Sequence, residues 1–214
     1  MPVAALRWDE VVLDRTNHHW RELTSLAKLL LGGRFQTTTS GEAEGFSLLF
    51  AMNTLFEKYV ARMLVRALKS PLRVEPQRPL HCLEELDGDR GLRFQVIPDI
   101  LIKRGPETLL VIDTKWKQLK GRSVDPKQDV SQADIYQMLA YSRIYCCSRL
   151  MLLYPHHAEL GGTDHVTTRY RVIGSVDSEL AISTIDIGLA EGMTERLGEL
   201  VKRQLPHPSD LEAA

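Results

Sequence analysis

Apolar and polar positions alternate in ways that divide the chain into helical ends and a strand-rich middle. Apolar residues recur at helical spacing over residues 17–31, Phe46 to Leu68 and Ser131 to Cys146, and Met193 to Leu205 reads as a closing helix. Six short apolar and β-branched runs predict strands: LRVEPQ, RFQVIPDILIK, TLLVIDTKW, RLMLLYP, TTRYRVIGSV and LAISTIDI. The order α-α-β-β-β-α-β-β-β-α predicts an α/β (α+β) fold, a mixed sheet with helices packed on it.

The polar stretch RFQTTTSGEAEG follows the first helix and has the composition of a linker. We therefore predict a helix and linker over residues 1–45, one folded domain over residues 46–205 and a tail over residues 206–214. A chain of 214 residues is long enough for one domain with a substantial core.

Composition excludes several classes of protein. Hydrophobic residues make up 43% of the chain and charged residues 26%, which is ordinary for a globular protein. No apolar run approaches the roughly 18 residues of a membrane span, and no signal peptide develops at the start, so we expect a cytoplasmic protein. There is no Walker A motif and no GxGxxG, so the chain itself is not expected to bind GTP or a dinucleotide.

The three cysteines favour neither a disulfide framework nor a zinc site, because their number is odd and no CxxC occurs. We expect reduced, buried thiols. The adjacent histidine pairs His18–His19 and His156–His157 have no partner at ligand spacing, so we do not assign them a metal.

Two strands carry carboxylates where apolar residues would be expected. Asp99 interrupts one apolar run, and Asp113 and Lys115 interrupt the next. Side chains alternate along a strand, so Asp113 and Lys115 share a face, with Thr114 on the other. If RGPE turns the two strands into an antiparallel hairpin, Asp99 comes near Asp113. Two carboxylates, a backbone carbonyl and waters suit Mg²⁺, while Lys115 would orient the attacking water or neutralise charge on a phosphate. The alternative is a structural pair of edge carboxylates with a lysine partner.

Two helices carry further polar candidates. Glu57 lies on or beside the apolar stripe of the helix after Phe46, where a metal would be a suitable partner; the alternative is that it reaches solvent at the margin. Gln137 and Tyr141 lie four residues apart on the later helix, with Asp134 one turn earlier. They would contact DNA or support the metal site, or would be ordinary surface residues.

A basic stretch follows the second carboxylate strand. Trp116 is interleaved with its lysines and arginine, and we predict that the stretch contacts DNA phosphates; a solvated loop is the alternative. The candidates are Trp116, Lys117, Lys120, Arg122 and Lys127, with Lys103 and Arg104 added to them. The net charge of −1 means that any DNA footprint must come from such a local cluster.

Taken together, PDILI, VIDTKWK, ADIYQMLAY and LLFAMNTLFEKYV resemble the nuclease domain of McrC, a subunit of the McrBC modification-dependent restriction system. The resemblance runs from about Trp20 to about Pro155, and the Gln137-x-x-x-Tyr141 spacing is similar to the RecB-like branch of the PD-(D/E)xK nucleases. It implies a restriction-endonuclease-like sheet, with residues 46–205 as the nuclease domain.

The resemblance implies metal ligation by Asp99, Asp113 and Glu57, with Mg²⁺ or Mn²⁺ as cofactor. Thr114 is included in the predicted ligand set. Lys115 would be the catalytic lysine, with Gln137 and Tyr141 as supporting residues of the active site.

Three functions remain open at this point. The first is a metal-dependent DNA endonuclease subunit that works with an McrB-like AAA-type GTPase, the partner that would read the modified base. The second is a non-catalytic assembly or DNA-binding remnant, and the third is a stand-alone repair nuclease of the same superfamily. McrC-like proteins carry a further N-terminal region that contacts the GTPase, and we expect this sequence to lack it.

Overall fold

The structure is a computed structural model that describes residues 51–87, 90–121, 124–161, 165–174 and 178–206, with a few single positions before them. The chain separates into two compact units, residues 1–49 and 50–214. The predicted helix over residues 17–31, the linker and the start of the helix from Phe46 therefore lie largely outside the described residues. The same is true of the C-terminal tail and of His18 and His19.

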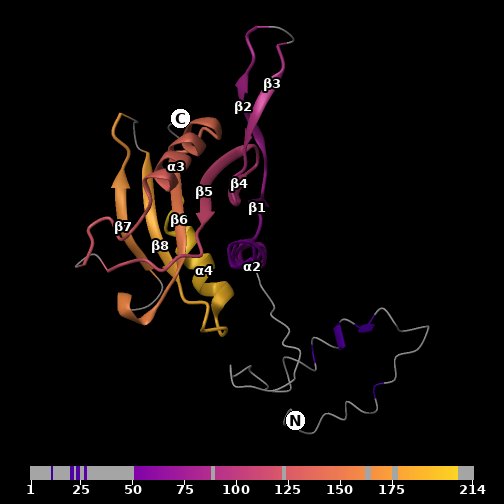
Figure 1. The fold of residues 1–214 in the computed structure, drawn as a ribbon, viewed down its shortest axis with the longest axis vertical. Coiled ribbons are helices and arrows are strands. Elements are labelled where there is room, and N and C mark those ends of the chain that lie inside the picture. Colours follow the sequence, from indigo (N-terminus) through magenta and orange to yellow (C-terminus); the bar gives the residue numbers. More distant parts are fainter. Residues whose placement is uncertain are drawn as a thin grey trace, which may run out of the picture. The chain divides into compact units, whose positions relative to one another are not determined.

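A six-stranded mixed sheet forms the centre of the second unit, in the order β1-β4-β5-β6-β8-β7. Its strands are β1 (Leu72–Pro76), β4 (Ile100–Arg104), β5 (Glu107–Thr114), β6 (Arg149–Pro155), β7 (His165–Arg171) and β8 (Glu179–Ile185). The middle strands β5, β6 and β8 are parallel, and β1, β4 and β7 are antiparallel to their neighbours. The predicted mixed sheet with flanking helices is thus confirmed (Figure 1).

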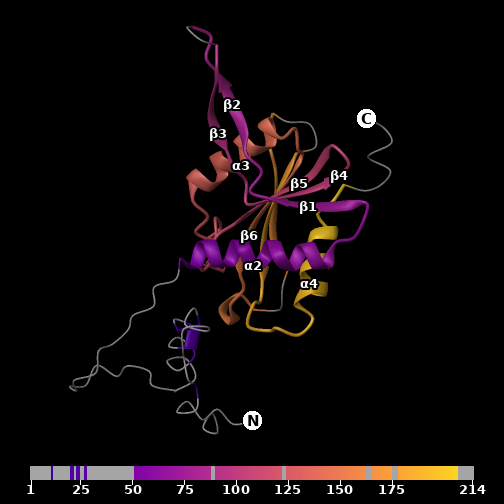
Figure 2. The same ribbon diagram turned by 90° about the vertical axis from the view of Figure 1, so that its right-hand side faces the viewer.

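Helices cover both faces of this sheet. The helices α2 (Met52–Ala67) and α4 (Met193–Lys202) pack on one face, and α3 (Gln132–Ile144) lies on the other (Figures 1 and 2). Alternation along β5 supplies both cores, because Leu110 and Ile112 join the α2–α4 side while Val111 joins the α3 side. A short 3₁₀ turn, Ala158–Leu160, follows β6.

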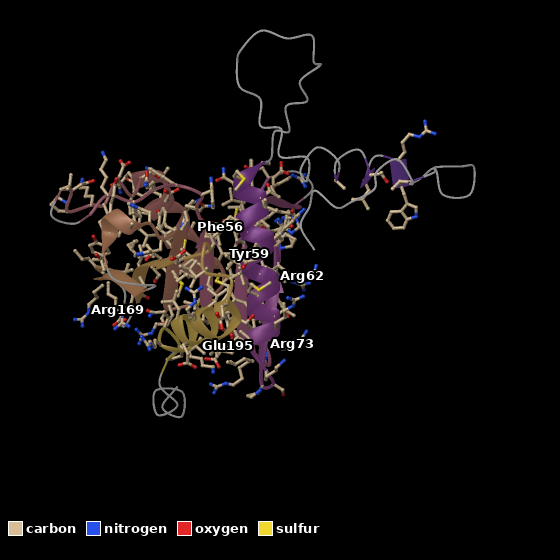
Figure 3. All side chains as sticks on the ribbon, turned by 90° about the horizontal axis from the view of Figure 1, so that it is seen from below. Phe56, Tyr59, Arg62, Arg73, Arg169 and Glu195 are labelled. Carbon is tan, nitrogen blue, oxygen red and sulfur yellow. The ribbon has the colours of Figure 1, made fainter. Side chains whose placement is uncertain are left out.

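The helix α2 buries the apolar stripe predicted for it. Phe56, Val60, Leu64 and Leu68 are at most 5% exposed, and Figure 3 shows Phe56 toward the body of the fold and Arg62 on the outer side. The helix begins at Met52, because Ala51 before it is not helical.

The helix α3 begins where predicted, because the Ser131 hydroxyl caps it by accepting from the Asp134 N–H. Its buried residues are Met138 and Tyr141. Leu139 and Cys146 are both exposed, and Cys146 lies beyond the helix end with a φ of 48°. Cys147 is the buried cysteine, so the prediction that all three thiols are buried is wrong.

The run RFQVIPDILIK, predicted as one strand, is two strands in different sheets. It breaks at Ile97–Asp99, where Pro98 has no N–H for a ladder. Its first half, β3 (Leu92–Val96), pairs with an unpredicted strand, β2 (Leu80–Glu84), in a two-stranded ribbon that projects beyond the main sheet (Figure 2). Nearly all of the ribbon's side chains are exposed, so its strands lack the alternation that identifies a half-buried strand.

The strand predicted as TLLVIDTKW ends at Thr114, so Lys115 and Trp116 follow the strand and lie at its carboxyl end. The turn between β4 and β5 is Gly105–Pro106, with Gly105 at a φ of 59°. No helix in the described part of the chain is long and apolar enough to cross a membrane.

We predict that Leu64→Ala lowers the free energy of unfolding by about 2–5 kcal/mol, because Leu64 is fully buried and its loss leaves a cavity. The matched control is Leu55→Ala on the same helix, where the side chain is 50% exposed and the loss should stay below about 1 kcal/mol. Urea unfolding monitored by circular dichroism measures both. Equal losses in the two variants would contradict the packing of α2.

Candidate active site

The register of the β4–β5 hairpin brings Asp99 and Asp113 together. Ile100 pairs with Ile112, so Asp99 and Asp113 occupy the next positions at the end of the ladder. Asp99 Oδ2 accepts hydrogen bonds from the backbone N–H of Thr114 at 2.6 Å and from its hydroxyl at 2.7 Å. The predicted antiparallel hairpin is confirmed, and Thr114 fixes one of its two carboxylates.

Asp113 is a buried carboxylate with an incomplete set of partners. Its side chain is 2% exposed, and Lys115 Nζ lies 2.7 Å from Oδ2. This ion pair compensates the charge of Oδ2, and among the described residues no further partner is found for that buried oxygen. Burial, and then the charge of Asp99, raise the pKa of Asp113 from its usual 3.8 to about 6.

Lys115 is surrounded by three oxygen-bearing side chains. Besides Asp113, its Nζ lies 3.0 Å from Gln137 Oε1 and 3.4 Å from Asp134 Oδ1. Burial acts to lower the pKa of Lys115, but the contacts with Asp113 and Asp134 outweigh it and the pKa is raised. The ammonium therefore stays charged at neutral pH.

Gln137 and Tyr141 connect Lys115 to the segment that carries Asp99. Gln137 Nε2 donates to the Tyr141 hydroxyl at 2.7 Å, and that hydroxyl donates to the Ile97 carbonyl at 2.8 Å. Burial raises the pKa of the Tyr141 phenol, which keeps its proton available for this bond. Gln137 therefore contacts Lys115 directly, and Tyr141 is linked to Lys115 through Gln137.

Glu57 enters the site from α2. Its Oε1 accepts from Gln77 Nε2 at 2.7 Å, and the Gln77 backbone N–H donates to the Asp99 carbonyl at 2.9 Å. Burial, and then the charge of Asp99, raise the pKa of Glu57. Glu57 thus faces the carboxylates at the strand ends, and Gln77, just after β1 with a φ of 48°, links the two.

An open cleft of about 540 Å³ joins these groups. Every predicted catalytic residue lines it except Tyr141, which lies behind Gln137. The lining residues are Asn53, Thr54, Glu57, Asp99, Asp113, Thr114, Lys115, Trp116, Lys117, Ser131, Asp134 and Gln137. Sequence reasoning did not find Gln77, which carries no motif, and it named Asp134 only beside Gln137 and Tyr141, without linking it to Lys115.

The predicted DNA-contacting residues are only partly brought together. Trp116 packs on Phe56 with ring centroids 5.6 Å apart but stays 37% exposed, and Lys117 Nζ donates to the Asp129 carbonyl at 2.6 Å. Lys120 is exposed, and Arg122 lies outside the described residues.

Lys103 and Arg104, which we added to the basic cluster, do not belong to it. Both lie at the opposite end of β4 from Asp99, roughly 13 Å (Lys103) and roughly 17 Å (Arg104) along the strand at about 3.3 Å per residue. Lys103 contacts Glu75 there, and Arg104 contacts Glu107.

The donor set fits a hard divalent cation. Within the part of the chain that the structure describes, no three His, Cys, Asp or Glu side chains converge into a preformed metal cluster. Asp99 nevertheless lies close enough to Asp113 for its charge to raise the pKa of Asp113, and the buried Asp113 Oδ2 is compensated only by Lys115 among the described residues. Carboxylate oxygens held in this way are the ligands that Mg²⁺ and Mn²⁺ prefer. His156 and His157 instead contact Thr184 and the Leu119 carbonyl.

Comparison with known proteins identifies the family. The profile of the McrBC 5-methylcytosine restriction system component matches residues 5–155. The chain belongs to the McrBC family. A search of curated proteins found no match.

A solved McrBC assembly has a similar fold. It is the half-complex from a tetradecameric assembly of Thermococcus gammatolerans McrB AAA+ hexamers with bound McrC. The similarity has a TM-score of 0.53 at 19% identity and covers 92% of this chain but 41% of the other. The present chain therefore spans less than half the length of that McrBC protein.

We predict that Asp113→Asn changes how the stability of the metal-free protein depends on pH. Because the folded state raises the pKa of Asp113 to about 6, neutral Asp113 contributes stability that is complete below about 3.8 and is lost as pH rises through about 6. Because asparagine does not ionise, the variant does not lose this stability as pH rises. The variant should therefore match the wild type near pH 4 and exceed it above pH 6 by on the order of 1–3 kcal/mol.

Urea unfolding in EDTA at several pH values between 4 and 7 measures this difference. A difference that stays constant across this range would show that Asp113 ionises in the folded protein as it does in the unfolded chain.

Proposed function

We propose that this chain is the metal-dependent nuclease of an McrBC-type restriction system and that it hydrolyses DNA phosphodiesters. The observation that carries the proposal is the convergence of Asp99, Asp113 and Lys115 in one open cleft, with Glu57 facing them from α2. A purely structural carboxylate buried beside a second one would be costly, and among the described residues the buried Asp113 Oδ2 has only its ion pair with Lys115 as compensation.

The metal would be Mg²⁺ or Mn²⁺, held by Asp99, Asp113 and Glu57 and by the Thr114 backbone carbonyl. When bound, such an ion supplies Lewis-acid polarisation of the scissile phosphate and a water that ionises near neutral pH. The Glu57 side chain would be the proposed ligand that can most easily change its position, since a single hydrogen bond from the Gln77 side chain holds it.

Lys115 has the role of a fixed cation beside the phosphate. Its raised pKa keeps the ammonium protonated, so it neutralises negative charge that develops on the phosphate oxygens and orients the attacking water. The attacking water loses a proton to solvent as its oxygen bonds to phosphorus. The bond between phosphorus and the leaving sugar oxygen breaks, and that oxygen takes up a proton. Gln137 holds the ammonium in place by a hydrogen bond. Gln137 is itself held by Tyr141, whose hydroxyl donates to the Ile97 carbonyl.

DNA would enter across the exposed surface that follows β5. Trp116, Lys117 and Lys120 would contact the backbone near the cleft, and the packing of Trp116 on Phe56 keeps its ring in a fixed orientation there. Arg122 remains a candidate for the same surface.

The partner would be an McrB-like AAA+ GTPase, as in the solved assembly of McrB with McrC. The partner would select modified DNA and this chain would cut it. Co-elution of the two purified proteins in size-exclusion chromatography tests the association. Separate elution with and without GTP would contradict it.

We predict that the wild type cleaves supercoiled plasmid with Mn²⁺ or Mg²⁺ and that Asp113→Asn lowers the rate by about 10²-fold or more, because a ligand charge is lost. The matched control is Glu107→Gln, an exposed carboxylate at the opposite end of the same strand, which should cleave like the wild type. Gel electrophoresis of the plasmid measures both, with the partner and GTP added in a parallel series.

Metal binding gives a readout that needs no cleavage. Mn²⁺ should raise the melting temperature of the wild type and of Glu107→Gln, but not that of Asp113→Asn. An Asp113→Asn protein that still cleaves, or a wild type that neither binds Mn²⁺ nor cleaves with its partner, would overturn the proposal in favour of a non-catalytic subunit.

A further inference from the structure

The carboxylate of Asp134 is a member of the site that the motif does not include. Its side chain is 18% exposed, lines the cleft and lies 3.4 Å from Lys115 Nζ. The residue is fixed at the first turn of α3, where its backbone N–H donates to the Ser131 hydroxyl at 3.1 Å. Its position therefore follows from how the helix begins.

Asp134 and Gln137 act from the same face of α3. They are three residues apart, which places them one above the other on a helix, and both reach the Lys115 ammonium. The ammonium thus has three oxygen partners: Asp113 from its own segment, and Asp134 and Gln137 from the helix. An ammonium has three N–H donors, so this set matches its capacity.

Metal binding would change the balance among these partners. Asp113 is the nearest of the three, but a metal ion would compete for its charge and for the same Oδ2 atom. Gln137 is neutral. Asp134 is then the one charged partner of Lys115 in this set that is not also a proposed metal ligand.

We propose that Asp134 is a positioning residue that holds the Lys115 ammonium in the cleft once Asp113 engages the metal. This inference rests on the proposed nuclease function. Asp134 acts through Lys115 and not on the metal, because its ion pair is with the Lys115 ammonium. The same ammonium also contacts Asp113. The residue therefore controls the rate of the chemical step and leaves metal affinity almost unchanged.

The test compares Asp134→Ala, Asp134→Asn and Gln132→Ala with the wild type, all as the full chain. Asp134→Asn keeps a side-chain oxygen that can accept from Lys115 but removes the charge. Gln132→Ala is the control, since Gln132 is exposed at the start of the same helix. Circular dichroism checks the fold of each variant, and Asp134→Asn alone is used if Asp134→Ala does not fold.

The first readout is independent of cleavage. The ¹⁵N NMR signal of the Lys115 ammonium, assigned by its absence in Lys115→Gln, reports whether that group is held. In the Mg²⁺-loaded protein, where Asp113 would engage the metal, the signal should be sharp in the wild type and in Gln132→Ala, weakened in Asp134→Asn, and lost by exchange with water in Asp134→Ala.

The second readout separates the steps of the reaction. Asp134→Ala should lower kcat about 10–100-fold, change KM by less than about 3-fold and leave the Kd for Mn²⁺ within about 3-fold of the wild type. Asp134→Asn should recover part of the lost kcat.

Two results would overturn the inference. An unchanged Lys115 signal in both Asp134 variants would show that the residue does not hold the ammonium. A Kd for Mn²⁺ at least 10-fold weaker would make Asp134 a metal ligand instead. If the wild type does not cleave even with its partner and GTP, the proposed nuclease function fails, and the NMR signal and Mn²⁺ binding still decide the role of Asp134.

Discussion

The repulsion between two carboxylates held at the end of one hairpin is the constraint on which the site depends. Asp99 and Asp113 are held as neighbours by the β4–β5 register, and Asp113 has almost no contact with solvent. Such a pair is costly unless positive charge or hydrogen-bond donors compensate it. Thr114 supplies donors to Asp99, whereas Lys115 is the compensation that the described residues offer to the buried Oδ2 of Asp113.

The two faces of the sheet contribute different parts of this compensation. The α2 face brings Glu57, and Gln77 ties that side chain to the backbone at Asp99. The α3 face brings the partners of Lys115 and, through Tyr141, reaches the carbonyl of Ile97. Because each face has its own apolar core, both sets of polar groups rest on well-packed elements and meet only at the strand ends.

Sequence reasoning found the parts of the site that follow a simple period. Asp113 and Lys115 were placed on one face by strand alternation, and Glu57 was found because a charge interrupts an apolar helical stripe. Gln77 gave no such signal, since it follows a strand end and its role depends on a backbone contact to Asp99. The ribbon was missed because its exposed strands lack alternation, and Lys103 was misassigned because closeness in sequence hides the length of a strand.

The wide spacing of the site's hydrogen bonds along the chain also bears on folding. The bond from Gln77 to Glu57 spans 20 residues, that from Lys115 to Gln137 spans 22, and that from Tyr141 to Ile97 spans 44. Each closes a loop whose entropic cost is recovered only when the surrounding strands and helices have assembled. A nascent or partly unfolded chain therefore holds the acidic residues without their geometry, so the arrangement of the site is a property of the completed domain and appears last.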